Sequence, residues 1–133
     1  MIILRKNQTA TLNSAKLKSF EDAMLAYLKG AYPDSSKQEG ETQTRENIRK
    51  FLSQAEKYDI TIEHDVARFI DLMYAWPYDL EKDPEMSWAL EIIKQKDYTG
   101  TEKVDQFWEQ SEKLIDEQLG EGSSEGGNID NEG

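Results

Sequence analysis

The sequence predicts an all-α protein, in which a single compact bundle of about five helices precedes a disordered acidic C-terminal tail. Apolar residues recur every three or four positions along several segments, which is the period of one helix face. The prolines lie where such segments end or begin, as expected of a residue that cannot continue a helix. A chain of 133 residues has room for one core, so we expect a helical domain over residues 1–119 and a tail over residues 120–133.

The first helix is predicted over residues 11–32, where Pro33 interrupts the backbone hydrogen bonds. The members of its apolar stripe are Leu17, Phe20, Met24, Tyr27, Leu28 and Ala31. After the proline, the spacing of Ser36 and Glu39 fits a capping box, which predicts a short helical turn that ends at Gly40.

The second helix is predicted over residues 43–58, and the third begins after Thr61 as its N-cap. The expected inner face of the second helix is Ile48, Leu52 and Ala55, with Phe51 beside it. The expected inner face of the third is Ile62, Val66, Phe69, Ile70 and Met73. The third helix should end near Ala75, because Trp76 precedes Pro77 and is therefore biased against helical backbone.

Residues 77–82 are predicted to form a loop, after which Asp83 as N-cap and Pro84 as first residue begin a fourth helix. The buried candidates of this helix are Trp88, Ala89, Ile92 and Ile93. The last helix is predicted over residues 102–119, with Gly120 ending it. Its stripe consists of Val104, Phe107, Trp108, Ser111, Leu114, Ile115 and Leu119. The remaining Gly, Ser, Asn and acidic residues bury too little surface to order a tail.

The charge excludes several classes of partner. With 27 acidic and 16 basic residues the formal net charge is -11, so we expect no nucleic-acid partner and no membrane insertion. The absence of cysteine excludes disulfides and cysteine-ligated zinc. Arg5 and Lys6 follow a short apolar run, the reverse of the order in a signal peptide, and no run approaches the length of a membrane span. The sequence therefore predicts a cytoplasmic protein.

No catalytic or metal-binding motif is evident. His64 is the single histidine, and its position near a helix start beside Asp65 is typical of an exposed or capping residue. The alternating acids Asp79, Glu81, Asp83 and Glu85 lack the glycine and terminal glutamate of a calcium-binding loop. We therefore expect a protein that is not an enzyme and that uses no cofactor or metal.

Two groups of residues are candidates for partner binding. Asp65, Arg68 and Asp71 share one helix face, either as an exposed salt-bridged ladder or with Arg68 half-buried against a neighbouring helix or a partner's carboxylate. Around Pro77, aromatic residues on irregular backbone are flanked by acidic residues. These aromatic residues, and Trp108 on the last helix, either fill the core or anchor a partner. The predicted partner-binding residues are Arg68, Asp71, Trp76, Tyr78, Asp79, Leu80, Asp83 and Trp88.

Several segments resemble a family of small bacterial proteins encoded beside type VI secretion effectors and their loading adaptors. Residues 56–61 (EKYDIT) are similar to the junction between that family's second and third helices, and residues 65–73 (DVARFIDLM) to its central motif. Tyr78-Asp79-Leu80, then Asp83-Pro84 and Trp88-Ala89, follow in the same order. At Trp76-Pro77 the chain departs from the glycine-containing turn of the family. The resemblance implies a cytoplasmic accessory that helps an adaptor hold or release its effector.

Three functions compete on this basis. The first is an effector accessory or co-chaperone that binds the loading adaptor or the effector through residues 74–88. The second is an immunity protein that neutralises a cognate toxin, which the strong acidity favours because many toxins have basic substrate clefts. The third is an enzyme, which ranks last because the sequence shows no nucleophile and base that would come together and no cofactor motif.

Overall fold

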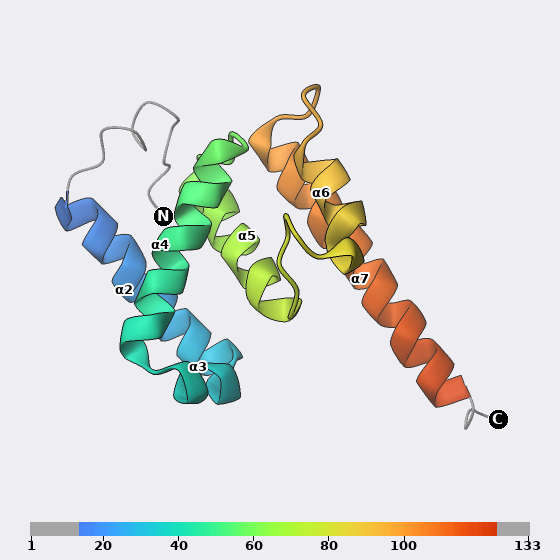
Figure 1. Ribbon diagram of the computed structural model, residues 1–133, viewed down its shortest axis with the longest axis horizontal. Helices are drawn as coiled ribbons and strands as arrows, with labels where there is room; N and C mark the ends of the chain where they lie inside the picture. Colours follow the sequence, from blue (N-terminus) through green and yellow to red (C-terminus); the bar gives the residue numbers. More distant parts are fainter. Residues whose placement is uncertain (1–13, 125–133) are drawn as a thin grey trace.

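The computed structural model describes residues 14–124 of the chain, with side chains from 17 to 118. This part is all-helical (Figure 1). Its α-helices are α2 (Ser14–Ala31), α3 (Pro33–Glu39), α4 (Glu41–Lys57), α5 (Glu63–Ala75), α6 (Ser87–Ile93) and α7 (Gly100–Ser124). A short 3-10 helix, η1 (Pro84–Met86), precedes α6. The predicted fold class is therefore confirmed, and α3 is the helix beyond the five expected.

Helix α5 is the central element. It packs against α4 on one side and α7 on the other, while α2 and α3 pack on α4, and α6 packs on α7. Figure 1 shows this order across the molecule, from α2 and α4 through α5 to α6 and α7. Residues of α5 can therefore contact both halves of the bundle.

Helix boundaries follow local chemistry. Pro33 ends α2 and also begins α3, because a missing N–H costs nothing in a first helical turn. Gly40, at φ 83°, separates α3 from α4. The predicted N-cap Thr61 is wrong: Ile62 occupies that position in extended conformation and makes no side-chain cap bond. Asp83 is confirmed as an N-cap, since its carboxylate accepts a hydrogen bond from the Glu85 N–H at 3.0 Å.

Helix α7 is longer than predicted at both ends. Thr99 and Glu102 form a reciprocal capping box, in which each side chain accepts a hydrogen bond from the other residue's backbone N–H. The helix continues to Ser124, so the prediction that Gly120 ends it is wrong. Leu119, a predicted stripe residue, lies outside the described side chains. Residues 125–133 of the predicted tail lie outside the described backbone.

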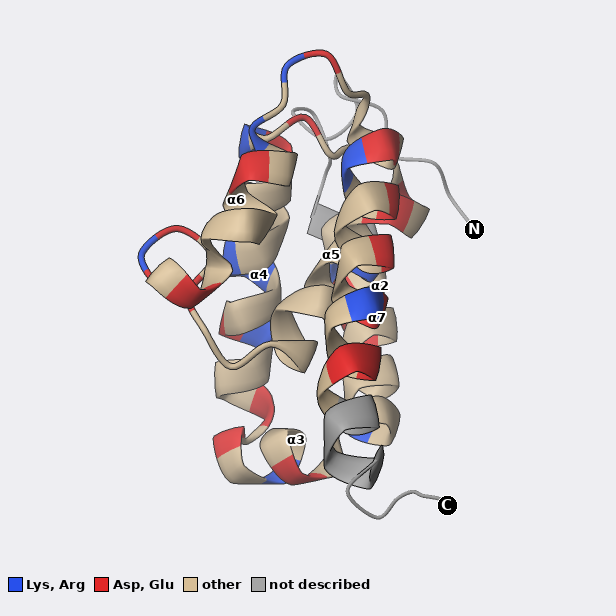
Figure 2. Cartoon of the chain, turned by 90° about the vertical axis from the view of Figure 1, so that its right-hand side faces the viewer, with Lys and Arg blue, Asp and Glu red and all other residues tan. Residues whose placement is uncertain are grey.

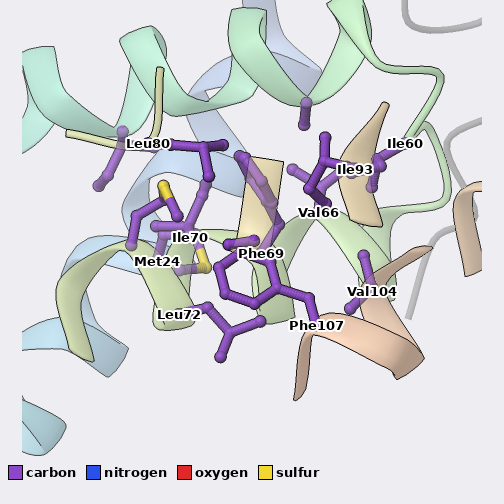
Figure 3. Close-up of a cluster of buried hydrophobic side chains, with 14 of the residues drawn as sticks. Met24, Ile60, Val66, Phe69, Ile70, Leu72, Leu80, Ile93, Val104 and Phe107 are labelled. Carbon is purple, nitrogen blue, oxygen red and sulfur yellow. The ribbon is translucent and has the colours of Figure 1, made fainter. Parts of the chain in front are cut away.

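One hydrophobic core joins the helices (Figure 3). At its centre Phe69 and Phe107 are fully buried and meet edge to face, with ring centroids 6.4 Å apart. The core residues are Phe20, Met24, Leu25, Leu28, Ile48, Ala55, Ile60, Val66, Phe69, Ile70, Leu72, Met73, Leu80, Met86, Ala89, Ile93, Val104 and Phe107. The predicted stripe of α2 is wrong at Leu17, Tyr27 and Ala31, which are exposed.

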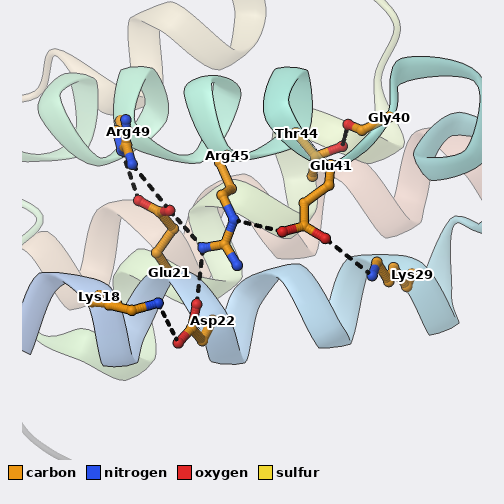
Figure 4. Close-up of polar contacts among 9 residues, drawn as sticks. All are labelled: Lys18, Glu21, Asp22, Lys29, Gly40, Glu41, Thr44, Arg45 and Arg49. Atoms are coloured by element: carbon orange, nitrogen blue, oxygen red, sulfur yellow. Dashed lines mark hydrogen bonds and ion pairs between the residues drawn. The ribbon is translucent and has the colours of Figure 1, made fainter.

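Ion pairs join α2 to α4 beside this core (Figure 4). The buried Glu21 carboxylate accepts hydrogen bonds from Arg45 Nη1 and Arg49 Nε, both at 2.7 Å. Arg45 also reaches Asp22 and Glu41. Burial raises the pKa of Glu21, but the two arginines outweigh this effect and the pKa lies below its usual value. The basic side chains of α4 thus compensate the acids of α2.

The start of α7 docks on the turn between α4 and α5. Asp59 has a φ of 64° in this turn, a left-handed conformation that aspartate tolerates better than most residues. Lys103 Nζ donates a hydrogen bond to the Tyr58 carbonyl oxygen at 2.8 Å. A Cβ atom added to Gly100 would fall on the Asp59 carbonyl oxygen and the Ile60 Cα. The close approach of the two backbones therefore requires glycine at this position.

None of the helices in the described part of the chain is long and apolar enough to cross a membrane.

Candidate functional site

Arg68 ties α5 to α7. Its Nη1 atom donates a hydrogen bond to Asp105 Oδ1 at 2.8 Å and lies 3.6 Å from Asp65 Oδ1. Its guanidinium group also lies over the Trp108 ring, 5.4 Å from the centroid. The side chain is 24% exposed, so the half-buried alternative holds and the exposed ladder does not. Asp65 is buried and accepts a hydrogen bond from Thr101 Oγ1 at 2.5 Å.

Asp71 faces α2. Its carboxylate accepts hydrogen bonds from the Tyr27 hydroxyl at 2.7 Å and from the Tyr32 hydroxyl at 2.5 Å. The hydrogen bond to Asp71 is the main cause that raises the pKa of Tyr27 to about 12. Burial is the main cause that raises the pKa of Tyr32, and Asp71 adds to it. Asp65, Arg68 and Asp71 therefore connect α5 to two different helices.

The aromatic group around Pro77 is largely part of the packing. Trp76 Nε1 donates a hydrogen bond to Ser111 Oγ at 2.7 Å. The Trp76 and Trp88 rings meet edge to face at 5.3 Å, and Trp88 meets Phe107 at 5.6 Å. These two tryptophans pack half-buried against the core, and both also line a surface cleft.

The loop after α5 leaves one aromatic side chain exposed. Leu80, predicted to bind a partner, is only 2% exposed and belongs to the core, because its side chain turns inward from the loop. Asp79 accepts hydrogen bonds from the Glu81 and Lys82 N–H groups and thereby shapes the turn. Asp83 caps η1. Tyr78, in contrast, is 39% exposed.

Two adjoining clefts of about 280 and about 490 Å³ share Ala75 and Ile115 and lie between α5 and α7; together we name them the α5–α7 groove. Its residues from α2, the junction of α2 with α3, α5 and the loop after α5 are Tyr27, Ala31, Tyr32, Asp71, Leu72, Ala75, Trp76, Pro77 and Tyr78. Those from η1, α6 and α7 are Glu85, Trp88, Trp108, Ser111, Glu112, Leu114, Ile115 and Gln118. Of the predicted partner-binding residues, Asp71, Trp76, Tyr78 and Trp88 meet here, while Arg68, Asp79, Leu80 and Asp83 do not.

Several of the large apolar side chains that are exposed to solvent line the groove. Tyr27, Tyr78 and Ile115 are 48%, 39% and 38% exposed, and they line it from three different segments. Tyr27 and Ile115 were not predicted as site residues, because both lie on predicted inner stripes. A stripe becomes surface where no neighbouring helix covers it, and the sequence alone does not reveal where that happens.

Within the described residues, the groove is lined by apolar side chains, tyrosine hydroxyls and carboxylates. No group of three His, Asp or Glu side chains in this part of the chain could hold a metal ion. His64 is exposed on the first turn of α5 and does not line the groove.

Comparisons with known proteins found no family, no curated protein and no solved structure that matches this chain.

Proposed function

We propose that the protein is a non-catalytic, protein-binding accessory for a type VI secretion effector or its loading adaptor, acting in the cytoplasm. The observation that carries the protein-binding part is the α5–α7 groove, where exposed tyrosine and isoleucine side chains surround half-buried tryptophans. Tyrosine and tryptophan are enriched among the residues that dominate binding energy. The resemblance of residues 56–61 and 65–73 to proteins encoded beside such effectors supports the choice of partner.

The test is capture of a named partner by the tagged full-length protein, with candidate effectors and adaptors expressed one at a time. Tyr78→Ala should weaken binding by at least about 1 kcal/mol, since an exposed aromatic side chain of the groove is removed. Tyr98→Ala is the matched control, because Tyr98 is 38% exposed but does not line the groove. Calorimetric titration measures the affinity, and urea melts of both variants measure the stability. An affinity loss in both variants alike, or one explained by unfolding, would contradict the proposal.

An immunity protein is the second candidate, and the net charge of -11 favours it. Acidic inhibitors associate rapidly with the basic clefts of toxins that act on anionic substrates. Cell protection separates the two functions. An immunity protein rescues cells that produce the toxin alone, whereas an accessory changes only the stability or the delivery of the effector.

A further inference from the structure

We infer that the α5–α7 groove binds a basic amphipathic helix of the partner protein, an inference that rests on the proposed protein-binding function and specifies its ligand. Three acids line the groove, namely Asp71, Glu85 and Glu112, and no lysine or arginine lines it. The ligand class follows from this distribution of charge and from the shape of the apolar floor.

The acids of the groove lack cationic partners, in contrast to the acids that join α2 to α4 and α5 to α7. Glu21, Asp22 and Glu41 share Arg45 and Arg49, and Asp105 pairs with Arg68. Among the described side chains, no ion pair forms with any of the three groove acids. Within residues 17–118, the donors to the Asp71 carboxylate are the two tyrosine hydroxyls. A partner that supplies lysine or arginine would therefore meet uncompensated carboxylates.

The floor of the groove suits a helix. The α7 residues that line it, from Trp108 to Gln118, recur at spacings of three and four and extend over about 15 Å at 1.5 Å per residue. Ala75 is small and lines both clefts, and the small residues Ala31 and Ser111 line the first cleft, so a partner can approach closely there. A partner helix of about three turns, with apolar residues at positions i, i+4 and i+7, would cover this length.

Other occupants fit less well. The described part of the chain has no strand whose edge an extended peptide could extend. A second copy of the chain would place acid on acid, since each copy carries a net charge of -11. Figure 2 shows several acidic bands along α7, the helix that a second copy would have to approach.

The experiment uses two labelled helical peptides of about 15 residues with the same leucine stripe, one with a lysine polar face and the other with a glutamate polar face. Fluorescence anisotropy measures their binding to the full-length protein. Only the lysine peptide should bind, and its affinity should fall as salt is raised. In the double variant Glu85→Lys with Glu112→Lys, the affinity for the lysine peptide should fall at least tenfold, about 1.4 kcal/mol.

The control is the double variant Glu46→Lys with Asp97→Lys, which changes the net charge equally at exposed residues of α4 and of the loop before α7, outside the groove. It should bind the lysine peptide within about twofold of the wild type, since the nearby field is unchanged. An equal loss of affinity in both double variants would show that the lysine peptide responds only to the net charge of the protein, and it would overturn the inference. Equal binding of the glutamate peptide would overturn it as well.

Two further outcomes separate this inference from the proposed function. If the named effector or adaptor binds the Glu85→Lys, Glu112→Lys variant as well as the wild type, the inference fails and the proposed function stands. If the lysine peptide binds as expected but no effector or adaptor is captured, the groove specificity stands and the proposed function fails. Concentration-dependent dimerisation that Ile115→Glu abolishes would assign the groove to a second copy and overturn the inference.

Discussion

Trp76 on the loop after α5 donates its indole N–H to Ser111 Oγ on α7, at 2.7 Å. Ser111 is buried, so Ser111→Ala leaves the indole donor without this partner. We expect a destabilisation of about 1–2 kcal/mol, the lower part of the range for an unsatisfied buried donor, because Trp76 is only half-buried. Urea melts measure it. Ser53→Ala, at an exposed position of α4, is the control and should change stability by less than about 0.5 kcal/mol.

Asp71→Asn should change the alkaline behaviour of the protein. Tyr27 has a pKa raised to about 12, mainly by its hydrogen bond to Asp71, so the neutral phenol is favoured in the folded state. Its contribution to stability is fully present below the ordinary tyrosine pKa of 10.0 and is lost as the pH rises toward about 12. In Asp71→Asn the pKa of Tyr27 should fall toward 10.0, as followed by tyrosinate absorbance. Glu46→Gln, on exposed α4 surface, should leave the titration unchanged; a titration like the wild type in Asp71→Asn would contradict the hydrogen bond.

Phe107→Ala should destabilise the protein by about 3–5 kcal/mol, because Phe107 is fully buried between Phe69 and Trp88. Leu114 lies on the same helix but is only half-buried at the groove, so Leu114→Ala should cost less than half as much. Chemical denaturation of both variants tests the division of α7 into a core part and a surface part. Equal losses would show that Leu114 also belongs to the core.

Gly100→Ala should destabilise by about 1–3 kcal/mol, the usual range for overpacking, since the added methyl group meets backbone atoms of Asp59 and Ile60 that cannot move independently. Gly30→Ala is the matched control: its Cβ would meet nothing within 4 Å, inside a helix. It should therefore stabilise by up to about 1 kcal/mol through helix propensity. Thermal melts compare the two. A neutral Gly100→Ala would mean that α7 docks less closely on the turn than the structure has it.

Much of the fold could be predicted from the sequence, because helix period and proline position are local signals. The inner positions Val66, Phe69, Ile70 and Met73 of α5 are buried as predicted, since this helix has neighbours on both sides. The stripe of α2 failed at Tyr27, where no helix covers the end of the stripe. Leu80 was unpredictable for a related reason: a loop has no period that tells which side chain turns inward.

The candidate site was predictable only in part. Tyr78 and Trp76 could be found because proline, aromatic residues and a change of helix coincide there. Ile115 and Glu112 could not, since they come from a helix distant in sequence, and their meeting with Ala75 depends on how α5 and α7 pack. Contacts between elements far apart in the chain carry no local pattern.

The division of α7 between buried and exposed turns has a consequence for its amide protons. Val104, Phe107 and Ser111 are buried and fix the first turns in the bundle, whereas Leu114 is only half-buried and Ile115 is exposed. Local opening should therefore require much less free energy at the second group, and its amides should exchange with deuterium first. A ligand in the groove covers these turns and adds its binding energy to their closed state. Slowed exchange at Leu114 and Ile115, with no change at Val104, would then report occupancy of the groove for any partner, in a single spectrum.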